Sequence, residues 1–304
     1  MEKKKIAVLI PCYNEEKTIV KVIREFYRVL PEATIYVYDN NSTDKSWVLA
    51  NKENCILKKE SRQGKGNVVR SMFRDIDADC YLMIDADYTY STKNARKMCN
   101  LVLNDKFDMV IGDRLAGGYF EVNKRLFHNF GNRLFRFLIN FLFSADIKDV
   151  LSGYRAFSRD FVRSFPALSN DFESEVEMTI FAIQNHFKIS SIPVLYKDRI
   201  DGSFSKLSTY KDGLKILIAI KKLFKMYKPK VYYCFFSFFS IIVSFIFYFF
   251  DIDIILENNL LSLIFFCISI FLFLIGSMLD FISMYFKQLF EKYLRLLRGD
   301  FDEK

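Results

Sequence analysis

The sequence is poor in the side chains that most often bind transition metals. Its 304 residues include two histidines, six cysteines and one tryptophan. His128 and His186 have no partners at metal-ligand spacing, and the cysteines form no CxxC pair. A histidine or thiolate metal site is therefore not predicted. The cysteines are expected to be reduced structural thiols in a cytosolic domain.

Two glycine motifs of common nucleotide-binding folds are also missing. The chain contains neither GxGxxG nor GxxxxGK followed by Ser or Thr. A dinucleotide-binding domain and a P-loop domain are therefore poor interpretations of this sequence.

Charge is nearly absent from two long runs near the C-terminus, at about 231–250 and 260–281. At a rise of ~1.5 Å per residue, each run is long enough to cross a hydrocarbon core of ~30 Å. Buried core helices are the alternative, but they would need a covering layer for which too little chain remains. We therefore expect a transmembrane hairpin.

Basic residues flank these runs, and the link between them, DIDIILENN, is acidic. The basic residues are Lys221, Lys222, Lys225, Lys228 and Lys230 before the hairpin, and Lys287, Lys292, Arg295 and Arg298 after it. The positive-inside rule predicts an inner-membrane protein that spans the membrane twice, with the N-terminal domain and both termini in the cytoplasm. Anionic lipids account for the net charge of +8, so no nucleic-acid partner is expected. No cleavable signal is expected either, because MEKKK leads directly into a strand.

The first hundred residues alternate between strand-like and helical patterns. Strand-like runs such as IAVLI, TIYVYD and CYLMID are separated by helical runs such as EEKTIVKVIREFYRVL and NVVRSMFRDI. This alternation predicts an α/β fold with a mainly parallel sheet that is covered on both faces.

Polar residues follow each of the first four predicted strands. The segments are PCYNEE at 11–16, DNNSTD at 39–44, RQGKG at 62–66 and DAD at 85–87. Each alone can be a helix cap or a tight turn, and capping is a good explanation for Ser42 and Asp44. Because open α/β sheets bind ligands at the carboxyl ends of their strands, the ordered set predicts a nucleotide site.

Asp85 and Asp87 directly follow a buried strand, where two carboxylates repel each other and lose hydration. One interpretation is that Asp85 ends the strand and Asp87 caps the next helix. The other is that a divalent cation binds both carboxylates, since hard cations prefer oxygen ligands.

The motifs resemble those of the family-2 inverting glycosyltransferases of GT-A fold, in particular the polyprenyl-phosphate glycosyltransferases related to dolichol-phosphate mannose synthase. In chain order they are PCYNEE, DNNSTD, GKG, DAD, GDR, DVLSGYRAF, FESEVEM and GSFSKLSTYKDG, followed by the hairpin. The resemblance implies a Rossmann-like GT-A domain followed by a two-helix transmembrane hairpin. The expected parts are a cytosolic catalytic domain at 1–210, a basic juxtamembrane helix at 211–230, the hairpin at 231–282 and a cytosolic tail at 283–304.

The resemblance implies a role for most of these motif residues. The nucleotide would be bound by Pro11, Tyr13, Glu15, Asp39, Lys65 and Asp85. Asp85 and Asp87 would hold Mg²⁺ or Mn²⁺ on the diphosphate, where the metal assists the leaving group. Related enzymes often carry Gln two residues past the second aspartate, and here that position is Thr89.

The resemblance also implies an acceptor site beside the sugar. Asp149 would be the catalytic base or would orient the acceptor, and Arg114 would grip the acceptor phosphate. Further acceptor or lid residues would be Arg125, Arg133, Ser152, Arg155, Arg199, Ser205 and Lys206. Arg125, Arg133 and Arg136 lie on a stretch rich in Phe and Leu, which is either an interfacial helix or an ordinary core helix.

Two segments keep alternative interpretations. Glu175, in FESEVEM with Glu173 and Glu177, would contact a sugar hydroxyl, although helix capping explains part of this cluster equally well. Residues 199–206, with Gly202 and Ser203, would form a lid over the diphosphate, or a flexible linker before the hairpin.

The predicted function is inverting transfer of a sugar from a nucleoside-diphosphate sugar, with UDP expected rather than GDP, to polyprenyl (undecaprenyl) phosphate. A homo-oligomer is expected by resemblance. One alternative is a non-catalytic, membrane-anchored protein that binds nucleotide sugars. Another is a processive polysaccharide synthase, but those enzymes share a QxxRW motif and the single tryptophan here is Trp47.

Overall fold

The computed structural model describes residues 4–117, 126–171, 173–200, 209–250 and 260–298. The chain divides into two compact units, an N-terminal unit at 1–220 and a C-terminal unit at 221–304. The N-terminal unit contains a seven-stranded sheet in the order β3-β2-β1-β4-β6-β5-β7. Its strands are β1 (Ile6–Cys12), β2 (Thr34–Asp39), β3 (Ile56–Lys59), β4 (Cys80–Met83), β5 (Met109–Asp113), β6 (Arg155–Ser158) and β7 (Ile189–Pro193).

The sheet is mainly parallel, as the alternating sequence pattern predicts. β6 is the exception, because it pairs antiparallel with both β4 and β5. The carboxyl ends of the other strands therefore lie at one edge of the sheet, together with the segment that leads into β6. The polar residues that follow the parallel strands therefore lie at this edge.

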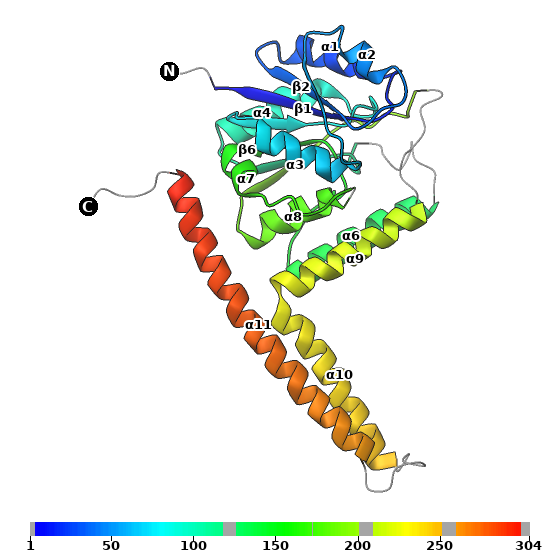
Figure 1. Cartoon of the computed structure of the whole chain (residues 1–304), viewed down its shortest axis with the longest axis vertical. Helices are drawn as coiled ribbons and strands as arrows, with labels where there is room; N and C mark the ends of the chain where they lie inside the picture. The colour runs from blue at the N-terminus through cyan, green and yellow to red at the C-terminus, as the bar shows by residue number, and fades with distance from the viewer. Residues whose placement is uncertain (1–3, 118–125, 172, 201–208, 251–259, 299–304) are drawn as a thin grey trace, which may run out of the picture. The chain divides into compact units, whose positions relative to one another are not determined.

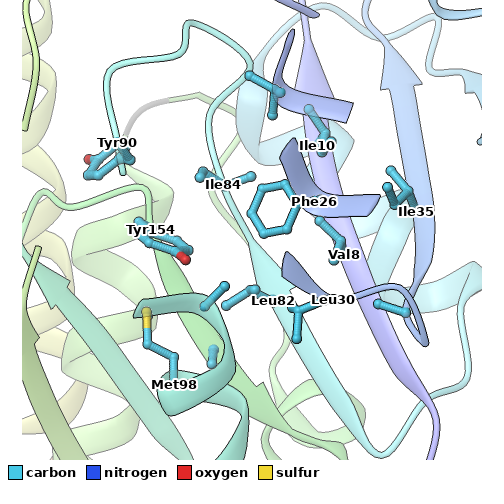
Figure 2. Packing of buried hydrophobic residues seen from close by; sticks show 14 of the residues in the cluster. Val8, Ile10, Phe26, Leu30, Ile35, Leu82, Ile84, Tyr90, Met98 and Tyr154 are labelled. Carbon is cyan, nitrogen blue, oxygen red and sulfur yellow. The ribbon is translucent and has the colours of Figure 1, made fainter. Parts of the chain in front are cut away.

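Helices cover both faces of the sheet (Figure 1). The helices of the N-terminal unit are α1 (Ile19–Val29), α2 (Ser46–Ala50), α3 (Lys65–Asp75), the short η1 (Thr92–Asn94), α4 (Ala95–Leu103), α6 (Leu126–Phe143), α7 (Arg159–Ser164), α8 (Ser174–Gln184) and most of α9 (Thr209–Tyr227). On one face, apolar residues of α1 and α4 pack on alternate residues of β1, β2 and β4. Figure 2 shows Phe26 of α1 beside Val8 and Ile10 of β1, with Tyr90 and Tyr154 close to each other.

The opposite face is packed mainly by aromatic rings. Phe73 of α3 makes edge contacts with Tyr81 of β4 and Phe157 of β6. Phe157 in turn stacks on Phe161 of α7, at 4.9 Å between ring centroids. Edge-to-face and offset-stacked pairs are the favoured aromatic geometries, and this cluster joins the four elements α3, β4, β6 and α7.

Helices α6 and α9 lie side by side (Figure 1). Gly213 of α9 faces the ring of Phe135 on α6. α6 buries Phe135, Ile139 and Phe143, while Phe130, Phe137 and Phe141 on its other side are 62–70% exposed. The helix is therefore apolar on its exposed side as well as on its buried side.

The C-terminal unit contains two antiparallel helices, α10 (Pro229–Phe250) and α11 (Leu260–Arg298). Both are long and apolar enough to cross a membrane by length and composition, and only 17% of the most apolar window of each is buried. Serines on α10 meet α11 directly: Ser237 donates to the carbonyl of Ser269, Ser240 to that of Phe265 and Ser244 to that of Ser262. Such hydrogen bonds between helices remain favourable in an apolar environment.

Candidate active site

Two loops after β1 and β2 are held together by reciprocal hydrogen bonds. The backbone N–H of Asn14 donates to Ser42 Oγ at 2.9 Å, and the N–H of Thr43 donates back to Asn14 Oδ1 at 2.7 Å. The N–H of Glu15 donates to Ser46 Oγ at 2.7 Å. Ser42 therefore holds the loop that carries Tyr13 and Glu15, and the half-buried Pro11 and Tyr13 stay at the sheet edge.

Asp39, the last residue of β2, has a buried acceptor atom without a partner. The residue is 2% exposed, and its Oδ2 accepts from the N–H of Ser42 at 3.1 Å. Its Oδ1 is buried and has no hydrogen-bond partner within the described residues. Because an unsatisfied buried carboxylate oxygen is costly, this atom is well suited to accept a hydrogen bond from a ligand.

Asn40 connects the β2 end to the glycine-bearing loop before α3. Its amide donates to the carbonyls of Glu60 and Arg62, and its Oδ1 accepts from the N–H of Gly64 at 2.7 Å. Glu60 is bound by Arg62 and Ser71. The hydrogen bonds from Arg62, above all, lower the pKa of Glu60 to about 2.

The two glycines of this loop allow a close approach between backbones. Gly64 has φ +122°, and a Cβ there would lie 2.2 Å from the carbonyl oxygen of Asn170. A Cβ at Gly66 would lie 2.4 Å from the carbonyl oxygen of Ser169. Only glycine fits at both positions, and the close packing fixes the start of α3, where Lys65 lies.

Lys65 bridges two carboxylates from different elements. Its Nζ lies 2.5 Å from Asp85 Oδ1, after β4, and 2.6 Å from Glu175 Oε1, in the first turn of α8. Burial alone would lower the pKa of Lys65, but the two carboxylates outweigh burial and raise it. Burial would likewise raise the pKa of Asp85, yet Lys65, with smaller contributions from Arg199 and Arg114, lowers it.

Asp87 has two partners of its own. Its Oδ2 lies 2.6 Å from Nη2 of Arg199, which follows β7. Its Oδ1 accepts from the hydroxyl of Thr89 at 2.6 Å and from the N–H of Thr89 at 3.2 Å. Thr89 thus fixes the Asp87 carboxylate, whereas Ser91 caps η1. The cationic partners of the aspartate pair in this structure are a lysine and an arginine.

Gly153, before β6, lies against the carboxylate of Asp85. A Cβ at this position would lie 2.3 Å from Asp85 Oδ2. The N–H of Gly153 donates to the hydroxyl of Tyr90 at 3.0 Å, and the ring of Tyr90 contacts Tyr154. Neither Gly153 nor Tyr90 could be predicted at this site, because nothing in the local sequence pattern indicates this contact.

Arg114 and Asp149 form a buried ion pair. Nε of Arg114 lies 3.0 Å from Asp149 Oδ2, and the same oxygen accepts from the Arg114 backbone N–H at 3.2 Å. Ser152 Oγ donates to the carbonyl of Gly112 at 2.6 Å, which anchors the loop to β5. Asp149 therefore orients the guanidinium beside the strand ends.

Arg155 is fully buried beneath this loop. It donates to the carbonyls of Val150 and Ser152 and to the hydroxyl of Thr179. Burial lowers its pKa to about 10. These partners give Arg155 a supporting position under the loop rather than a position at its surface.

The remaining predicted residues are not brought to this edge by a described contact. Arg133 is exposed on α6. Glu177 accepts from the N–H groups of Leu168 and Ser169, so it holds the loop that packs on Gly64 and Gly66. Arg125, Gly202, Ser203, Ser205 and Lys206 lie outside the described residues.

The site can be tested for its fit to a divalent cation. Within the described part of the chain, no group of three or more His, Cys, Asp or Glu residues is arranged to hold a metal ion. Asp85 and Asp87 offer hard oxygen ligands on one loop, but a full set would need oxygens from a ligand. The residues therefore fit Mg²⁺ or Mn²⁺ bound together with a diphosphate.

Comparisons with known proteins agree with this fold. The family model described as Glycosyl transferase family 2 matches residues 7–165. The chain is 35% identical to glycosyltransferase AglJ of Haloferax volcanii over 229 residues, which are 75% of each chain. It is 29% identical to a dolichyl-phosphate hexose transferase of the same organism over 71% of this chain and 92% of the relative.

A solved structure has a similar fold at low sequence identity. It is glucosyl-3-phosphoglycerate synthase from Mycobacterium tuberculosis in complex with Mn²⁺, UDP and glucosyl-3-phosphoglycerate. The two align with a TM-score of 0.58 and 17% identity, over 72% of this chain and 80% of that one. The seven-stranded sheet is thus GT-A-like, and the family match over half of the sequence, with the relative at 35% identity, shows that this chain belongs to glycosyl transferase family 2.

Proposed function

We propose that this glycosyltransferase transfers a sugar from a UDP-sugar to a polyprenyl phosphate at the cytosolic face of a membrane, with inversion at the anomeric carbon. The observation that carries the proposal is the set of groups at one sheet edge. These groups lie at or after strand ends: the buried acceptor on Asp39, the Asp85 and Asp87 pair, and the basic Lys65, Arg114 and Arg199. Acidic and basic groups together suit a metal-bound diphosphate and a second phosphate.

The nucleotide would bind at the ends of β1 and β2. Oδ1 of Asp39 would accept the ring N–H of uracil, a contact that cytosine cannot provide in its neutral form. Tyr13 and Glu15 would contact the nucleotide from the loop that Ser42 and Ser46 hold. UDP in the solved structure of similar fold supports this choice of nucleotide.

The diphosphate would bind beside the aspartate pair. Asp85 and Asp87 would hold Mg²⁺ or Mn²⁺, which when bound supplies charge neutralisation for the departing nucleoside diphosphate. Lys65 and Arg199 would add hydrogen-bond donors to the same phosphate oxygens.

The acceptor phosphate would bind at Arg114. One of its oxygens attacks the anomeric carbon, a C–O bond to that oxygen forms, and the bond from the anomeric carbon to the diphosphate oxygen breaks. The leaving UDP takes the electron pair of the broken bond. A phosphate is already ionised near neutral pH, so Asp149 is needed to orient Arg114 rather than to abstract a proton.

The lipid part of the acceptor would contact an apolar surface of the protein. The exposed Phe130, Phe137 and Phe141 of α6 and the exposed Leu214 and Ile218 of α9 suit insertion into a membrane surface. The two apolar helices α10 and α11 support membrane association, as does the relative named dolichyl-phosphate hexose transferase.

The proposal is tested with membranes that contain the full chain. They are incubated with polyprenyl phosphate, Mg²⁺ or Mn²⁺ and a panel of radiolabelled UDP- and GDP-sugars, and lipid extracts are examined for labelled product. We expect a lipid-linked sugar from one UDP-sugar and loss of more than about 99% of it in Asp87→Ala. If no donor yields a product, the proposed function is wrong. A normal biological output from Asp87→Ala in the host would instead favour a non-catalytic, nucleotide-sugar-binding protein.

A further inference from the structure

We infer that Lys65 and Arg199 are built-in counter-ions of the Asp85 and Asp87 pair, so that the pair takes a divalent cation only together with a diphosphate. Glu175 is then a positioning residue, which keeps Lys65 in place while Asp85 exchanges partners. The inference deepens the proposed function and rests on it for the identity of the diphosphate.

The contact distances support the counter-ion role. Lys65 Nζ lies within 2.6 Å of both Asp85 and Glu175, and Arg199 Nη2 lies 2.6 Å from Asp87. The Lys65 and Asp87 side chains are only 12% and 8% exposed, so water screens these pairs weakly. Removing one partner from such a pair leaves an uncompensated buried charge.

The charge balance of the site explains why cation and diphosphate would bind together. Asp85, Asp87 and Glu175 carry three negative charges against the two positive charges of Lys65 and Arg199, which leaves one net negative charge. A divalent cation alone would reverse the sign of the site. A cation together with the two negative charges of a sugar diphosphate leaves the net charge unchanged.

The exchange would involve side chains that are already in contact with each other. Asp85 and Asp87 would hold the cation, and the ammonium group of Lys65 and the guanidinium group of Arg199 would donate to the phosphate oxygens instead. Asp87 keeps its hydrogen bonds from Thr89, which hold one oxygen in place. Lys65 would keep its ion pair with Glu175 Oε1, and the other carboxylate oxygen of Glu175 accepts a hydrogen bond from Ser174 Oγ at 3.0 Å.

The position of Glu175 distinguishes a positioning residue from a sugar contact. It is 3% exposed in the first turn of α8, and Lys65 lies against its Oε1. Without Glu175, a released Lys65 would have no second carboxylate to bind. We therefore expect Glu175→Gln to weaken the gain in Mn²⁺ affinity that UDP produces, with little effect on Mn²⁺ binding in the absence of nucleotide.

The experiment measures Mn²⁺ binding to the purified full chain in detergent, by electron paramagnetic resonance of free Mn²⁺, with and without UDP. For the wild type we expect weak binding of Mn²⁺ alone and at least about tenfold tighter binding with UDP. Arg199→Met and the double variant Lys65→Met/Glu175→Gln should each bind Mn²⁺ alone about tenfold more tightly. Each lacks a positively charged side chain that competes with Mn²⁺ for the aspartate carboxylates. In both, the gain from UDP should shrink.

The variants are chosen to keep the test valid. Arg199 is the more exposed of the two basic residues, so its loss should be tolerated if the buried Lys65 variant fails to fold. The double variant removes the charge of Glu175, which could otherwise become an extra metal ligand. Arg96→Met is the matched control: it removes a 2.7 Å ion pair with Glu32 on a different part of the unit and should leave Mn²⁺ binding unchanged.

The outcomes separate this inference from the proposed function. If Arg199→Met folds and binds Mn²⁺ alone no more tightly than the wild type, the inference is wrong, even if the enzyme transfers sugar. If the variants bind Mn²⁺ alone more tightly but no donor yields a product, the counter-ion role stands and the proposed function fails.

Discussion

Close approach decides which residues can lie beside the aspartate pair. Gly153 packs against Asp85 because it has no Cβ, and the Tyr90 hydroxyl holds its backbone there. The loop before β6 and the loop after β4 are thereby fixed to each other. The carboxylate of Asp85 is positioned by this packing as well as by its ion pair with Lys65.

Gly153→Ala should displace Asp85 without unfolding the domain. The added methyl group would lie 2.3 Å from a carboxylate oxygen, so the Asp85 side chain must move. We expect at least a tenfold loss in affinity for Mn²⁺ with UDP, about 1.4 kcal/mol, measured by titration calorimetry. The melting temperature should change by only a few degrees. The control is Gly131→Ala on α6, where the nearest atom would be 3.6 Å away and binding should stay normal. Normal binding in Gly153→Ala would contradict this role.

At the residue scale, the sequence reveals the aspartate pair but not its partners. Asp85 and Asp87 are adjacent to a strand in the sequence, so their position at a strand end is predictable. Lys65 and Arg199 come from distant parts of the chain, and their pairing with the aspartates depends on the tertiary fold. The same holds for Arg114 with Asp149, each of which was predicted singly. The individual roles of these residues in catalysis remain predictions.

The segment between β3 and α3 behaves as one hydrogen-bonded element. Asn40 binds two of its carbonyls, Glu60 binds Arg62 within it, and Ser71 of α3 donates to Glu60. Because Lys65 directly follows this segment, its stability contributes to the position of the ammonium group.

The pKa of Glu60 predicts how this element responds to acid. Its folded-state pKa is about 2, below the ordinary value of 4.5. The unfolded chain therefore takes up a proton at higher pH than the folded chain does. The stability that Glu60 contributes is complete above about pH 4.5 and is lost as the pH falls toward 2. Thermal unfolding of the full chain in detergent between pH 6 and 3 should show a shallower pH dependence in Glu60→Gln than in the wild type. Identical slopes would contradict the prediction.

Helix α6 gives a direct test of membrane contact. Phe137 and Phe141 are exposed and their rings are stacked, which leaves an aromatic surface facing outward. In a Trp47→Phe background, Phe137→Trp and Phe141→Trp place a single fluorophore on this surface. Brominated lipids in nanodiscs should quench both by about half. Val48→Trp, at an equally exposed apolar position on α2, should be quenched much less. Equal quenching at all three positions would argue against an interfacial α6.

At the scale of elements, the sequence pattern predicts the strands and helices up to β5, short ones included, but not β6. The alternating patterns up to β5 correspond to strands and helices in the structure. The antiparallel β6 has four residues, RAFS, and two of its neighbours in space, β4 and β5, come earlier in the chain. RAFS has no continuous apolar run such as the CYLM of the equally short β4, and its pairing comes from the sheet rather than from its own sequence.

At the scale of the whole molecule, the sequence combines an enzyme-like N-terminal unit with an apolar C-terminal unit. The sheet of the N-terminal unit needs no lipid to bury its apolar residues, because helices cover both of its faces. The helices of the C-terminal unit leave most of their apolar surface exposed. This contrast is consistent with a glycosyltransferase that associates with a membrane, and hydropathy alone could predict the contrast.

The distribution of charge predicts an orientation in the membrane that can be tested on the full chain. Basic residues gather before α10 and near the end of α11, whereas the link at 251–259 carries three acidic residues and no basic ones. The positive-inside rule then predicts that both ends of the hairpin lie in the cytoplasm.

Alkaline phosphatase, which is active only outside the cytoplasm, should be active when fused after residue 256 and inactive when fused after residue 304. A green fluorescent protein that folds only in the cytoplasm should give the opposite result. Replacing Lys221, Lys222 and Lys225 with Gln removes part of the positive charge that keeps the segment before α10 in the cytoplasm. Some chains should then insert with the hairpin inverted, which raises the phosphatase activity of the C-terminal fusion. An active phosphatase at the wild-type C-terminus would contradict the predicted orientation. Either the hairpin would be inverted, with the nucleotide site outside the cytoplasm and away from a cytosolic sugar donor, or only one of its helices would span the membrane.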